Sequence, residues 1–151
     1  MAPNDNAPPG AYATIMGTFA TGLAGAALLA KALGREPREN DALDLLVLSL
    51  ATFKTARTIA RDDVASFIRG PFVEDDEPVE TGDLRQAIGE LVTCSRCVGT
   101  WVAAGLGCTQ VLAPRFGRLL TWTLAAGALN DFAQAGFAAL TAKANELEQR
   151  D

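Results

Sequence analysis

The chain has 151 residues, of which 49% are hydrophobic, and it carries a formal net charge of −5 with no histidine. This length accommodates one domain, and the lack of a basic face argues against a nucleic-acid-binding protein. Without histidine the chain lacks the commonest acid–base residue and metal ligand, and its three cysteines are too few for a secreted disulfide framework.

The N-terminal region consists of a polar lead and a long uncharged run. Residues 1–10, MAPNDNAPPG, have no positive charge ahead of the apolar run, so they do not resemble a secretory signal peptide and are expected to be a disordered lead. Residues 11–30 contain no charge, and roughly 20 apolar residues suffice to cross a bilayer. The run is rich in glycine, alanine and threonine, which let helices pack closely in lipid. We predict a first membrane span over residues 11–33.

A second span is predicted over residues 41–60, and it ends in a basic stripe. Lys54, Arg57 and Arg61 follow the spacing i, i+3 and i+7, which places them on one helical face. In one interpretation these cations extend toward lipid headgroups. In the other, Arg57 lies deep enough to need a carboxylate partner inside the bundle.

Residues 62–83 form a hydrophilic connection whose first part is amphipathic and whose second part is acidic. Residues 73–83 contain six carboxylates together with Pro78 and Gly82, which is typical of a solvated loop; calcium binding is the alternative. Asp83 with Gln86 three positions later resembles a capping box. A helix is therefore predicted to begin here and to lead into the third span.

The third and fourth spans are predicted over residues 97–113 and 119–141, so that residues 11–142 form a helical membrane domain and residues 143–151 a solvated tail. Three polar residues lie in the middle of the fourth span: Asn130, Asp131 and Gln134. An ionisable group within a span marks either a buried partner or a pathway. Lys54 or Arg57 is the expected counter-charge of Asp131. Asp131 is interpreted either as a structural residue that holds neighbouring helices together or as part of an ion or proton pathway.

A Cys-x-x-Cys pair, Cys94 and Cys97, precedes the third span. Such a pair can be a redox couple, half of a tetrahedral zinc site, or two small apolar side chains. Cys108 lies about 16 Å farther along a helix, so the three thiols cannot share one ion. Without histidine, zinc requires either the cysteine pair of a second chain at an oligomer interface or a nearby carboxylate such as Glu90. We favour no bound cofactor.

Three segments together carry a resemblance: DLLVLSLATFKTARTIARDDVASFIRGPF, GELVTCSRCVGTWVA and LNDFAQAGFAAL. They resemble the small bacterial membrane proteins grouped as domain of unknown function 1360, over about residues 43–140. The matching positions are Ala51, Thr52, Phe53, Lys54, Arg57, Arg69, Pro71, Phe72, Thr93, Cys94, Cys97, Gly99, Trp101, Val102, Asp131 and Phe132. Ser95-Arg96 departs from the family's more usual Pro-Trp. The resemblance implies a multi-span protein of the bacterial inner membrane, and it implies no activity, substrate or cofactor.

These observations predict an all-α protein with four spans in the lipid bilayer; the alternative is a soluble bundle of alanine-rich helices. With both termini and the acidic loop in the cytoplasm, that side carries eight Lys and Arg against five outside, and a lasting disulfide is not expected there. No nucleophile lies beside a base. The leading hypothesis is a non-enzymatic scaffold or accessory subunit that packs with itself or with a larger membrane complex. The alternatives are a channel or transporter component using Asp131, and a membrane thiol or metal protein using Cys94 and Cys97.

Overall fold

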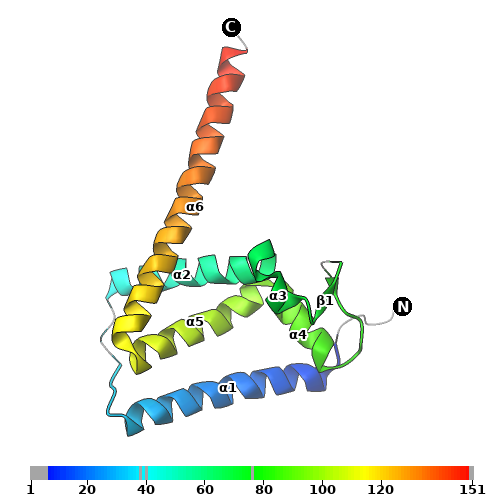
Figure 1. The fold of residues 1–151 in the computed structure, drawn as a ribbon, viewed down its shortest axis with the longest axis vertical. Helices are drawn as coiled ribbons and strands as arrows, with labels where there is room; N and C mark the ends of the chain where they lie inside the picture. The colour runs from blue at the N-terminus through cyan, green and yellow to red at the C-terminus, as the bar shows by residue number, and fades with distance from the viewer. Residues whose placement is uncertain (1–6, 38, 40, 76, 150–151) are drawn as a thin grey trace.

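The computed structural model describes residues 7–37, 39, 41–75 and 77–149, and the all-α prediction is confirmed. The longer elements are α1 (Pro9–Ala32), α2 (Ala42–Arg61), α4 (Leu84–Thr93), α5 (Ser95–Leu112) and α6 (Pro114–Glu148). Between α2 and α4 lie a short 3₁₀ helix, η1 (Asp63–Ala65), the one-turn helix α3 (Ser66–Arg69) and two short strands, β1 (Val73–Glu74) and β2 (Glu77–Pro78). Figure 1 shows α1, α5 and α2 in succession and α6 rising away from them.

The number of candidate membrane spans is smaller than predicted. Within the described ranges α1 alone is long and apolar enough to cross a bilayer by itself, which corrects the expectation of four such helices. In α2, the charges of Asp44, Lys54, Arg57 and Arg61 interrupt the apolar sequence, and in α6 the polar residues at positions 130, 131 and 134 do so. Helices α4 and α5 reach the length and apolarity of a membrane span only when they are taken together. They are bent by 88° at the break between them.

Helix α1 has well-defined ends. Pro9 occupies its first position, where the missing backbone N–H costs nothing. At its other end Gly34 adopts a φ of +63°, and the N–H groups of Gly34 and Arg35 donate to the carbonyls of Lys31 and Ala30 at 3.1 and 2.8 Å. This is the Schellman arrangement, which glycine favours because it has no Cβ. Residues 1–6 of the predicted lead lie outside the described residues.

Helices α2, α5 and α6 pack through small side chains. Their shared core contains Val47 and Ala51 of α2, Leu106 of α5 and Ala125 of α6. Near the start of α6, a Cβ on Gly117 would lie 2.6 Å from the Cα of Gln110, so only glycine permits the two backbones to approach this closely. The core therefore depends on close helix contact more than on large buried side chains.

The connection between α2 and α4 is folded rather than extended. Arg69 is 7% exposed and donates to the carbonyls of Ile59 at 2.8 Å and Asp62 at 2.9 Å. Strands β1 and β2 pair antiparallel, with Val73 opposite Pro78. Asp83 caps α4 as predicted, accepting from the backbone N–H of Arg85 at 2.8 Å. The hydrogen bond from the Thr81 hydroxyl and those from the backbone N–H groups of α4 lower the pKa of the Asp83 carboxyl.

Helix α6 continues to Glu148, beyond the predicted start of the tail at residue 143. Every described residue from 132 to 149 is exposed, and Figure 1 shows this distal half of α6 projecting from the rest of the protein. Lys143 forms an ion pair with Glu146 at 2.9 Å within the same helix. The last two residues of the predicted tail, 150–151, lie outside the described residues.

Candidate functional site

The two cysteines of the Cys-x-x-Cys motif meet where α4 turns into α5. The sharp bend leaves Cys94 in an extended conformation, with φ −95° and ψ 103°, as the residue that caps α5. Its Sγ accepts a hydrogen bond from the backbone N–H of Cys97 at 3.3 Å, and the two sulfur atoms are 2.6 Å apart. Both are free thiols; Cys94 is half-buried and Cys97 is exposed.

The surroundings of Cys94 favour its thiolate. The Cys97 thiol donates to Cys94, and this hydrogen bond is the largest cause of a Cys94 pKa below its ordinary value. The backbone N–H groups of Cys97 and Arg96 and the charge of Arg96 act in the same direction. A thiolate at the N-terminus of a helix is the reactive form of cysteine in thiol–disulfide exchange.

Within the described part of the chain, the thiol pair has no third His, Cys, Asp or Glu side chain placed to share an ion with it. Among the described residues no group of three or more His, Cys, Asp or Glu side chains is placed to hold an ion. Glu90, the carboxylate proposed as a further ligand, instead accepts hydrogen bonds from the Tyr12 hydroxyl and from Ala7 N–H, which is 3.2 Å away. The zinc site shared between two chains remains a prediction.

A basic pocket lies beside the thiol pair, between α2 and the first turn of α5. It has a volume of about 410 Å³, and Arg57, Arg61 and Arg96 line it together with Ser95. No described carboxylate lies within 4 Å of these three guanidinium groups. Thr52 also lines the pocket, and its Oγ1 is buried without a hydrogen-bond partner among the described residues. Within the described part of the chain, the pocket therefore combines the hydroxyl group of Ser95 with three cations that form no salt bridge.

The predicted polar cluster of α2 and α6 is only partly assembled. Lys54 Nζ lies 2.8 Å from Asp131 Oδ2, with side chains that are 28% and 36% exposed. Next to this pair, the rings of Phe53 and Phe132 stack with centroids 5.2 Å apart. Asp131 therefore has Lys54, and not Arg57, as its counter-charge. The remaining three residues are exposed and take no part in this pair: Arg57, Asn130 and Gln134.

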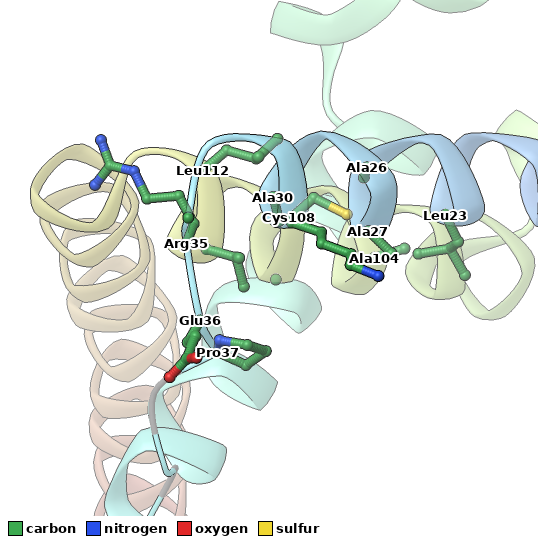
Figure 2. Close-up of a pocket in the computed structure, with 14 residues that line it drawn as sticks. Leu23, Ala26, Ala27, Ala30, Arg35, Glu36, Pro37, Ala104, Cys108 and Leu112 are labelled. Carbon is green, nitrogen blue, oxygen red and sulfur yellow. The ribbon is translucent and has the colours of Figure 1, made fainter.

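A third feature is an apolar cavity of about 620 Å³ between α1 and α5. Figure 2 shows Leu23 and Ala27 of α1 near Ala104 and Cys108 of α5, with Arg35 at one end. Cys108 therefore lies in a different environment from the thiol pair.

Neither this cavity nor the basic pocket was predicted. The sequence signals for the basic pocket are the basic stripe of α2 and Arg96, and their spacing does not show that they meet.

The fold and these sites define a small all-helical protein whose longest apolar helix, α1, is suited to a membrane. Residues 47–137 match the model of a family described as protein of unknown function (DUF1360), and the chain belongs to this family. It is 32% identical over 99 residues to sporulation protein YjcA of Bacillus subtilis (strain 168), a match that covers 58% of this chain and 84% of that protein. No solved structure matches the chain. The family resemblance predicted from the sequence is thereby confirmed.

Proposed function

We propose that this protein is a multi-pass scaffold of the bacterial inner membrane that assembles with copies of itself through α6. The observation that carries the membrane part is the exposure of α1. Only 6% of its most apolar 18-residue stretch is buried in the protein, whereas the core helix of a soluble protein is covered by its neighbours. An exposed apolar helix of 24 residues is stable when lipid surrounds it.

The directions of the helices support more than one crossing of the lipid bilayer by this chain. Tyr12 of α1 contacts Glu90 just before α5, and Phe19 packs on Trp101 within α5 with ring centroids 5.0 Å apart, so α1 and α5 run in the same direction. If both cross the bilayer, the chain must return between them. Helix α2 is antiparallel to α5 and provides that return: Ala56 lies beside Gly99, and Val47 beside Leu106.

The outward surfaces of the other helices are also apolar. Large side chains at least 40% exposed occur on α2 and on the first half of α6: Leu43, Leu45, Leu46, Phe53, Phe116, Leu119, Trp122 and Leu129. Exposed apolar residues on this scale mark a membrane or protein interface. The charge of Lys54 is compensated by Asp131, which supports the structural role of this pair and lets α2 lie at membrane depth.

The proposed assembly surface is a stripe that begins at Leu129 and continues along the distal half of α6. Leu129, Ala133, Gly136, Leu140, Ala144 and Leu147 follow each other at intervals of three or four residues, the spacing that aligns side chains on one face of a helix. The face opposite carries Gln134, Ala138 and Asn145, and all these positions are exposed. A second α6 offers a matching stripe, because two identical helices present the same surface.

Reporter fusions test the membrane arrangement. Alkaline phosphatase, which is active only outside the cytoplasm, is fused after residues 37, 80, 113 and 151. We expect activity at 37 and 113 and none at 80 and 151, since each fusion point follows another crossing. If the fusions after 80, 113 and 151 all behave like that after 37, α1 is the only span and the multi-pass part of the proposal is wrong.

A pair of matched variants tests the assembly surface. Leu140→Glu places a charge on the stripe, and Ala138→Glu places the same charge on the opposite face of the same exposed helix segment. We expect chemical cross-linking in membranes to lose the dimer in Leu140→Glu only. Equal cross-linking of both variants and the original chain would show that α6 does not mediate self-association.

A further inference from the structure

In the thiol pair, Cys94 lies where its thiolate is stabilised, and the sulfur of Cys97 lies close enough to react with it. Cys94 caps the 18-residue helix α5, where the positive end of the helix dipole favours a thiolate. The Cys97 thiol donates to Cys94, and their sulfurs are 2.6 Å apart. Since both residues belong to one helical turn, a bond between them requires no movement of another element. Cys97 is exposed, so an incoming disulfide has access to the pair.

The basic pocket adjoins the same turn of α5. Ser95 and Arg96, which lie between the two cysteines, are part of its wall, and Arg57 and Arg61 of α2 form the other side. Three cations without a described carboxylate within 4 Å give the pocket a positive potential, and of the three the charge of Arg96 acts on Cys94. Ser95 contributes a hydroxyl group to the wall of the pocket. These groups are suited to a carboxylate, which accepts hydrogen bonds from guanidinium and hydroxyl groups.

We propose that Cys94 and Cys97 are a redox-active dithiol that reduces disulfides bearing carboxylate groups, and that Arg57, Arg61 and Arg96 bind such a carboxylate beside the reacting sulfurs. This activity does not depend on the scaffold function or on the number of membrane crossings. It requires only the α4–α5 turn and the end of α2.

The exchange is balanced without any further reactant. The Cys94 thiolate attacks one sulfur of the substrate disulfide, forming a mixed disulfide and releasing the other substrate sulfur as a thiolate, which takes a proton. Cys97 then loses its proton and attacks Cys94 Sγ. A disulfide forms between Cys94 and Cys97, and the second substrate thiol is released. Two electrons pass from the dithiol to the substrate, which is the oxidant.

The cysteine variants test the exchange. The reduced full-length protein in detergent is mixed with glutathione disulfide, and released thiol and protein mass are followed. We expect Cys94→Ser to abolish thiol release, and Cys97→Ser to stop at a mixed disulfide with one glutathione on Cys94. Cys108→Ser, which alters the thiol in the separate α1–α5 cavity, retains the original rate. If Cys94→Ser reacts as fast as the original chain, the proposal is wrong.

The arginine part is tested by comparing a charged with a neutral disulfide. In Arg57→Gln with Arg61→Gln we expect the rate with glutathione disulfide to fall about fivefold, as expected for the loss of two partly exposed charge contacts. The rate with 2-hydroxyethyl disulfide, which has no carboxylate, should stay the same. Equal losses with both probes, or no loss with either, would overturn carboxylate binding by this pocket. Lys143→Gln on the distal α6 is the control for a change in net charge.

Discussion

Lys54 and Asp131 are 77 positions apart in the sequence, and their Nζ and Oδ2 atoms lie 2.8 Å apart in the folded chain. This ion pair joins α2 to α6 near the end of their contact, where Phe132 also stacks on Phe53. Beyond Asp131 every described side chain of α6 is exposed. The pair thus marks the boundary between the packed half of α6 and its projecting half.

Replacing Asp131 with Asn is expected to lower stability modestly. The substitution leaves Lys54 without its counter-charge, and for a partly exposed pair the cost is about 1 kcal/mol. Thermal unfolding of the purified protein measures it. Gln134→Ala, about one turn farther along and exposed, serves as the control and should unfold like the original chain. The double variant Lys54→Asp with Asp131→Lys should recover part of the loss, and a double variant no better than Asp131→Asn would exclude a direct ion pair.

Gly117→Ala is expected to disrupt the contact between α5 and α6. Its added Cβ would lie 2.6 Å from the Cα of Gln110, which is backbone and cannot move aside alone. We expect a loss of about 1–3 kcal/mol, as for other overpacked positions. Gly105→Ala provides the comparison because nothing lies within 4 Å of its new methyl group, and helix propensity there favours alanine. Chemical unfolding that ranks Gly117→Ala as the more stable of the two would contradict the close approach.

The cap of α4 is expected to weaken in acid. The pKa of Asp83 is lower in the folded protein than in the unfolded chain, so its contribution is fully present above the unfolded value of about 3.9 and is lost as pH falls through the folded value. Hydrogen exchange of the first α4 amides, followed from about pH 6 to about pH 3, should show protection decreasing in the original chain. In Asp83→Ala this protection should be low throughout. A pH response that is the same in both proteins would assign it to other carboxyl groups.

Phe19→Ala is expected to loosen α1 from α5. The Phe19 and Trp101 rings meet edge to face at an interplanar angle of 67°, a geometry that contributes about 0.5–1.5 kcal/mol beyond area burial. In a Trp122→Phe background, the fluorescence of Trp101 should change when Phe19 is replaced. Met16→Ala, on an exposed position of the same helix, should leave the emission as it was. A change of equal size in both variants would mean that Trp101 does not sense this ring contact.

Local sequence was sufficient for the helices and for several of their ends. Asp41 and Asp83 accept hydrogen bonds from the first turns of α2 and α4, and Gly34 terminates α1 through its positive φ. Such signals act over a few residues, so they can be recognised without the fold. The polarity of residues 143–148 predicts a solvated tail, whereas the structure continues α6 to Glu148. Alanine, leucine, lysine and glutamate in this segment all favour helix.

Only the tertiary structure decided how the chemical groups meet. The sequence placed one thiol pair before an apolar segment, a basic stripe on the second helix and an acid in the last one. It could not choose between Lys54 and Arg57 as the partner of Asp131, and it gave no sign that the 88° bend makes Cys94 the cap of α5 or brings Arg96 beside Arg57. Helix periodicity fixes which residues share a face, but the packing of α2 against α5 and α6 is a property of contacts distant in sequence, and these determine where the charges and thiols come together.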